Sequence, residues 1–79
     1  MNLRLAHKLI AAAENHPLDP LKVRGRKEAR EVHLMAEAGL IQAMEFNEPN
    51  PPEAVITRIT HAGHQFYRAL RHLPLYANN

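Results

Sequence analysis

Apolar residues recur along the chain with two different periods, and these periods predict its secondary structure. In three segments they return every three to four positions, as in amphipathic helices; the segments are residues 3–15, 26–38 and 61–72. The first expected helix ends before Pro17, because proline cannot continue the helical hydrogen bonds. The second ends at Gly39, because glycine readily adopts the left-handed conformation that closes a helix.

Two further segments alternate apolar and polar residues, as half-buried β-strands do. Residues 21–24 predict a short edge strand, and residues 41–59 predict a hairpin whose turn, 47–52, contains three prolines. A helix, a glycine stop, a hairpin and a further helix follow in this order in the second half of a winged-helix domain. We therefore expect an α+β, mostly helical fold: one winged-helix-like domain over residues 1–79, with 73–79 as a short tail.

The two periods together predict one shared hydrophobic core. Its expected members are Val32, Met35, Ile41, Ile59, Phe66 and Leu70. Phe66 is the largest residue on the apolar side of the last expected helix, which also carries Ala62, Ala69 and Leu73. We expect Phe66 to anchor that helix to the hairpin, so that its replacement by alanine costs roughly 3–5 kcal/mol.

The composition excludes several classes of protein. A chain of 79 residues forms one domain, near the lower size limit for a stable core. It has no cysteine, which excludes disulfides and thiolate zinc sites and fits a reducing compartment. The longest aliphatic run, residues 9–13, is too short to span a bilayer, and the N-terminus lacks a secretory hydrophobic segment. We therefore expect a soluble cytoplasmic protein with no membrane partner.

Charge is distributed along the chain in blocks. Residues 19–30 contain five basic and two acidic residues, whereas residues 31–53 contain five glutamates and no lysine or arginine. From residue 54 onward the chain adds three arginines and three histidines. A basic block can bind nucleic acid, or it can be an ordinary solvated surface.

The basic block supplies the candidate nucleic-acid-binding residues. On a helical wheel, Arg26, Lys27 and Arg30 lie opposite the apolar arc. They are at the start of the helix that a winged-helix domain inserts into the major groove of DNA. Lys22 and Arg24, on the preceding strand, are the candidate phosphate contacts.

Two features oppose this interpretation. Only residues 18–25 remain for the helix that normally precedes the recognition helix, and Pro20 prevents them from forming one. The hairpin carries Glu45, Glu48 and Glu53, whose charges would repel the phosphate backbone. The alternative is a protein-interaction module of the same fold, which binds a protein partner or a second copy of itself and no DNA.

Two motifs resemble a known family. Residues 33–41, His-Leu-Met-Ala-Glu-Ala-Gly-Leu-Ile, and residues 58–66, Arg-Ile-Thr-His-Ala-Gly-His-Gln-Phe, are similar to motifs of short bacterial and phage proteins catalogued as a domain of unknown function. The similarity extends over residues 3–71. It implies a small winged-helix-like fold and brings no catalytic residue, cofactor or ligand. The chain departs from the family at His61, where an aromatic residue is frequent, and at Gln65, where the family has glutamate.

The six histidines raise the question of metal binding. His61 and His64 are three positions apart on the polar side of the last expected helix, a spacing that can hold a metal ion. No carboxylate lies within that helix to complete a ligand set, so we expect an exposed polar surface, shared with His72, and no metal. His33 borders an apolar arc and is expected to be half-buried or buried, and His64 to bond to the hairpin or the central helix.

No set of residues predicts catalysis. A pair formed by Thr60 and His64 lacks an orienting acid and an oxyanion site. The chain has no serine, and it is too small to enclose a pocket of ordinary ligand size. We therefore expect no enzyme, no catalytic residue, no cofactor and no small-molecule substrate. Of the two remaining functions we rank nucleic-acid binding before protein interaction, because winged-helix folds so often serve it, which is an analogy from fold.

Overall fold

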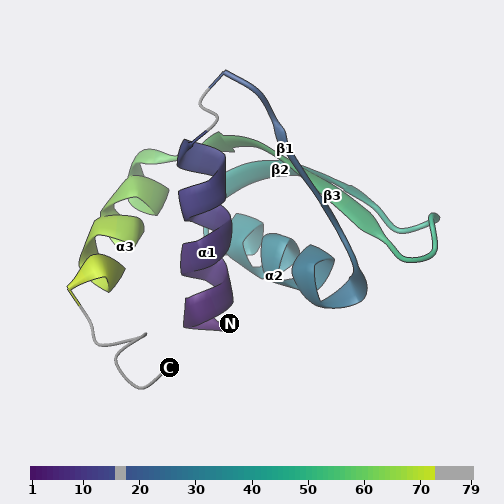
Figure 1. Ribbon diagram of the computed structural model, residues 1–79, viewed down its shortest axis with the longest axis horizontal. Helices are drawn as coiled ribbons and strands as arrows, with labels where there is room; N and C mark the ends of the chain where they lie inside the picture. Colours follow the sequence, from purple (N-terminus) through teal and green to yellow (C-terminus); the bar gives the residue numbers. More distant parts are fainter. Residues whose placement is uncertain (16–17, 73–79) are drawn as a thin grey trace.

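The computed structural model contains three helices and a three-stranded antiparallel sheet, and it describes residues 1–15 and 18–72 (Figure 1). The elements are, in order, α1 (Leu3–Glu14), β1 (Leu21–Arg24), α2 (Arg26–Glu37), β2 (Ile41–Phe46), β3 (Glu53–Ile59) and α3 (His61–Arg71). The fold is thus α+β and about half helical. All six expected elements are confirmed. Pro17, Leu73 and the tail expected over 73–79 lie outside the described residues.

Strand β3 is the centre of the sheet, and β1 and β2 pair with it on either side, both antiparallel. Successive residues of a strand point to opposite sides of a sheet, and partners across the strands share a side. On the inner side, Ala54 and Ile56 of β3 are buried beneath the helices. A bulge interrupts the β2–β3 register between Gln42 and Ala43. There the Thr57 hydroxyl donates to the Gln42 carbonyl oxygen at 3.1 Å.

The core lies between this inner side of the sheet and the helices. Its largest fully buried side chains are Ile10 of α1 and Met35 and Val32 of α2. Helix α1 lies between α2 and α3 and contacts both of them as well as β3 (Figure 1). Burying these faces of the helices and the sheet against each other supplies most of the stabilisation of a chain this small.

The expected core is confirmed in four of its members and corrected in two. Val32, Met35, Ile41 and Leu70 are buried, whereas Ile59 and Phe66 are only partly buried and pack against the edge of the core. On α3, Ala62 and Ala69 are exposed, so the predicted apolar arc of this helix is wrong at those positions. The physical reason is that α3 packs on α1 as well as on β3, which turns Gly63 and Leu70 inward.

Two glycines make the connections of α2. Gly39 has φ +79° and follows the last turn of the helix, as its C′ position requires, with its N–H donating to the Ala36 carbonyl at 3.0 Å. Gly25, with φ +124°, forms the turn between β1 and α2. Its N–H donates to the Pro52 carbonyl at 2.9 Å, so the start of α2 is held against the hairpin turn.

A buried carboxylate joins the first two helices. Glu31 of α2 is 5% exposed, and both of its carboxylate oxygens lie 3.1 Å from the backbone nitrogen of Asn2, which donates to them. Asn2 is also the N-cap of α1, because its side-chain oxygen accepts from the Leu5 N–H at 3.0 Å. Glu31 therefore fixes the start of α1 on α2, a role that the sequence pattern did not indicate.

No helix in the described part of the chain has the length and apolar character needed to cross a membrane.

Candidate nucleic-acid interface

The first turn of α2 presents the three cations expected there to solvent. Arg26, Lys27 and Arg30 are all exposed, whereas Ala29 and Val32 of the same helix are buried against the core. Within residues 1–15 and 18–72, no ion pair involves any of these three cations. Positive charge at a helix N-terminus is unfavourable, because the N–H groups there already carry partial positive charge. Glu28 in the same turn supplies one negative charge, and the three cations outnumber it, which favours an anion from outside the chain.

The two cations of β1 are also exposed, but they belong to a different surface. In β1, Leu21 and Val23 are half-buried and Lys22 and Arg24 exposed, so the two cations point away from the inner side of the sheet. The Lys22 ammonium forms an ion pair of 3.3 Å with Glu53 on β3. The five candidate residues therefore form two groups, three on α2 and two on the outer side of the sheet. The contribution of Lys22 and Arg24 to phosphate binding stays a prediction.

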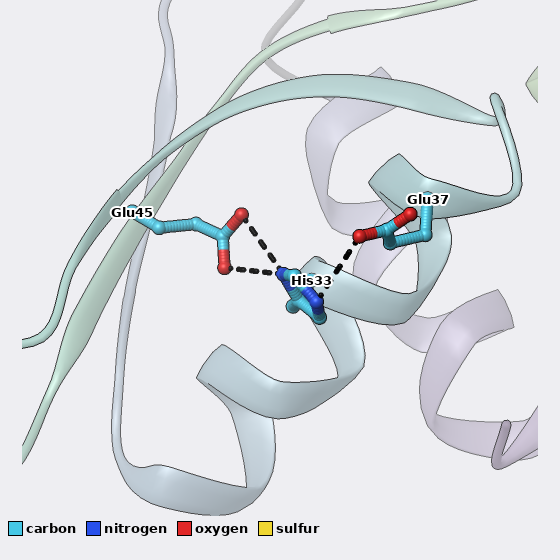
Figure 2. A network of polar contacts seen from close by, with 3 residues as sticks. All are labelled: His33, Glu37 and Glu45. Carbon is cyan, nitrogen blue, oxygen red and sulfur yellow. Dashed lines mark hydrogen bonds and ion pairs between the residues drawn. The ribbon is translucent and has the colours of Figure 1, made fainter.

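The carboxylates of the hairpin are mostly engaged. Glu45 points toward α2, where His33 Nδ1 lies 2.9 and 3.2 Å from its two oxygens, as Figure 2 shows. Glu53 has the Lys22 ion pair, and only Glu48 has no partner within the part of the chain described. The repulsion of phosphate that the sequence suggested is thereby reduced at two of its three sources.

His33 forms a hydrogen bond, as expected, but it is exposed, so the expectation of a buried or half-buried histidine is wrong. Its side chain is 51% exposed and lies between two carboxylates, with Glu37 one turn further along α2 at 3.4 Å from Nε2 (Figure 2). The helical wheel placed it at the boundary of the apolar arc. Strand β2 passes beside α2 at this point, and the contact with Glu45 holds the imidazole on the polar side.

A second histidine–glutamate pair joins α3 to α1. His64 Nδ1 lies 2.6 Å from a carboxylate oxygen of Glu14, so the expected bond to the hairpin or the central helix is wrong. The pair lines an open groove of about 320 Å³, together with Asp19, Thr57 and Arg58. In residues 1–15 and 18–72, no three histidine or carboxylate side chains are grouped so that they could hold a metal ion. The pair therefore acts as a link between helices.

Among the described residues 18–25 no helix precedes α2, as the sequence predicted. Residues 21–24 form β1, and Gly25 leads directly into α2. The sequence analysis did not single out the exposed apolar side chains of β2, Met44 and Phe46, although their alternation with Ala43 and Glu45 indicates that they point to the opposite side of the sheet.

Comparison with protein-family models, curated proteins and solved structures finds no match for this chain.

Proposed function

We propose that this chain is a winged-helix-like, nucleic-acid-binding module with α2 as its recognition helix. The observation that carries the proposal is the exposed group of Arg26, Lys27 and Arg30 at the helix start, for which the described part of the chain provides no acidic partner. Such a group matches the phosphates of a duplex, whose neutralisation dominates the affinity of most DNA-binding proteins.

The arrangement around α2 supports this role without a separate positioning helix. Strand β1 enters the helix through Gly25, and the hydrogen bond from Gly25 to Pro52 fixes the helix start to the hairpin turn. At its other end the Leu40 N–H donates to the Met35 carbonyl at 3.0 Å, and Leu40 continues into β2. A recognition element must be held rigidly, because contacts to base edges depend on its position. In this chain the sheet and its hairpin would hold the recognition helix in place.

The alternative function, a protein-interaction module without DNA binding, is favoured by a different observation. Met44 and Phe46 are 54% and 41% exposed on neighbouring outward positions of β2. Large apolar side chains grouped on a surface mark interaction sites.

The salt dependence of duplex binding tests the proposal. Replacing Arg26, Lys27 and Arg30 with alanine should reduce the slope of log affinity against log salt by about two to three. Each phosphate that is no longer contacted keeps its condensed counterions, so fewer ions are released on binding. The measurement is a titration of random-sequence duplex DNA at several salt concentrations. The fold should be retained because all three side chains are exposed, and a thermal melt followed by circular dichroism checks this.

The matched control is a second triple alanine variant, of Lys8, Arg58 and Arg68. These cations are also exposed but lie on α1, β3 and α3, so the variant has the same net charge and lacks the same number of cations. It should bind with nearly the wild-type slope. Equal loss in both variants would assign the binding to net charge alone and contradict a site on α2. Feeble binding of wild-type protein near physiological salt would reject the nucleic-acid function.

A further inference from the structure

The outer side of the sheet carries three chemically different columns of side chains, one on each strand. The strand register places Lys22, Val55 and Met44 in one row across the sheet, and Arg24, Glu53 and Phe46 in the next. Partners in antiparallel strands share a side, and the exposure of Lys22, Arg24, Met44 and Phe46 identifies this side as the outer one. The column on β1 is basic, the column on β2 is apolar, and β3 lies between them.

Nothing in residues 1–15 and 18–72 covers this surface. The helices contact the strands on the inner side, where Ala54 and Ile56 are buried. Exposed apolar side chains in two successive rows of an edge strand are unfavourable in water, and a partner that covers them gains the free energy of their burial.

The charge pattern next to the apolar column identifies the partner. A hollow of about 580 Å³ beside Phe46 is bordered by Glu45, Glu48, Glu53 and Lys22. Glu45 is bonded to His33 on the inner side and Glu53 is paired with Lys22, so Glu48 is the carboxylate of this hollow without a partner in the described residues. An occupant of this hollow should be cationic and should offer a side chain with an apolar stem to Phe46. Arg24 has these properties: it is exposed, it lies on the same outer side, and it belongs to no ion pair within the described residues.

We propose that two copies of this chain associate face to face through the outer sides of their sheets. A half-turn about an axis parallel to β3 places the basic column of one copy over the apolar column of the other. Arg24 of each copy then lies over Phe46 of the other, next to the carboxylate of Glu48. Because the basic and the apolar column lie on opposite edges of the same sheet, each contact between these two columns occurs twice, as a twofold interface requires.

The dimer does not depend on the nucleic-acid function. Its surface is the outer side of the sheet, whereas Arg26, Lys27 and Arg30 lie on a helix packed against the inner side. Self-association can therefore be measured with the protein alone. Success or failure of duplex binding does not alter the result.

Sedimentation of the full chain over a concentration series, up to about 1 mM, tests the proposal. The wild-type mass should rise from 9.0 kDa toward twice that value and no further. Arg24→Glu and Glu48→Arg should each weaken the dimer by about tenfold, because each change turns two attractions into two repulsions. An equimolar mixture of these variants should regain the wild-type affinity, because both pairs in the mixed dimer are then opposite in charge.

Recovery in the mixture separates the interface from damage to the fold, since an unfolded variant cannot be rescued by its partner. As a matched control, Arg68→Glu makes the same charge change on an exposed residue of α3 and should leave the dimer unchanged. A wild-type chain that stays at 9.0 kDa overturns the proposal. Association beyond two copies, or two variants that do not rescue each other, overturns the twofold arrangement.

Discussion

Replacing Gly63 with alanine should lower the free energy of unfolding by about 3 kcal/mol, at the upper end of what one added methyl group costs in a packed site. A Cβ at this position would lie 2.0 Å from the Leu40 carbonyl oxygen and 2.8 Å from Cγ2 of Ile59. The Leu40 oxygen cannot simply move away, because it accepts a hydrogen bond of 3.0 Å from the Thr60 N–H. Relief of the clash therefore requires α3 to move off the end of α2. Urea unfolding followed by circular dichroism measures the loss.

Whether Gly63→Ala lowers or raises the free energy of unfolding shows whether α3 lies against Leu40. In a helix, exchange of glycine for alanine ordinarily stabilises by about 1 kcal/mol, since it removes backbone freedom from the unfolded chain. A gain in stability would show that α3 does not approach Leu40. Gly39→Ala is the matched control: a Cβ there meets nothing within 4 Å, but φ is +79°. Only backbone strain should appear in this variant, at about 1–2 kcal/mol.

The position of Gly63 also explains part of the second sequence motif. The Thr60 hydroxyl donates to the Gly39 carbonyl at 2.7 Å and accepts from the Gly63 N–H at 3.0 Å. Threonine, followed three residues later by glycine, thus caps α3 and lets the helix start press against the end of α2. The glycine-containing motif that ends α2 supplies the two carbonyl groups on the other side, those of Gly39 and Leu40. The two motifs therefore form one junction.

The order and limits of the elements could be predicted from the sequence because local chemistry determines them. The change of apolar period separates helices from strands, and Gly25 and Gly39 lie at the two ends of α2, both with positive φ. Thr60 lies directly before α3 and caps it, because its hydroxyl accepts a hydrogen bond from the Gly63 N–H. Each of these signals acts within a few residues of the place it determines, so no knowledge of the tertiary structure is needed.

The structure differs from the sequence-based expectation where the environment of a residue depends on a segment that is distant in the sequence. Phe66 is the largest apolar residue of α3, yet it is only partly buried, because helix position and not side-chain size decides which residue enters the core. Its replacement by alanine should therefore cost less than the roughly 3–5 kcal/mol of a fully buried phenylalanine. His33 and His64 both bond to glutamates twelve or more positions away. A helical wheel contains no information about such partners.

The exposure of the five candidate residues could be predicted from the sequence, but their division between two surfaces could not. The exposure of Arg26, Lys27 and Arg30 follows from the wheel, and the exposure of Lys22 and Arg24 from strand alternation. That these two groups belong to different faces follows only from the sheet order, in which β1 pairs with β3 and turns its cations outward. The same register brings Arg24 into one row with Phe46, which are 22 positions apart in the chain.

Replacing Met35 with alanine should cost about 2–5 kcal/mol and leave little or no folded protein at room temperature. Met35 is fully buried, and Ile10 and Val32 of the same core cluster are equally inaccessible to solvent. Removal of its side chain leaves a cavity that the surrounding helices cannot fill without moving apart. A single core in a chain this small rarely supplies more than about 3–5 kcal/mol in total, so the loss approaches the entire stability. The far-ultraviolet circular dichroism spectrum and a urea titration measure it.

Met44→Ala is the matched control because it removes the same side chain from a position that is 54% exposed. Measured at a concentration where the chain is monomeric, it should change the stability by no more than about 0.5 kcal/mol. At concentrations where wild-type copies associate, the same variant should instead weaken the dimer, since Met44 belongs to the apolar column of the outer face. The two methionines thus separate the free energy that folds the chain from the free energy that joins two copies. Equal losses from both substitutions in the monomer would place Met44 in the core and contradict the outward orientation of its side chain on β2.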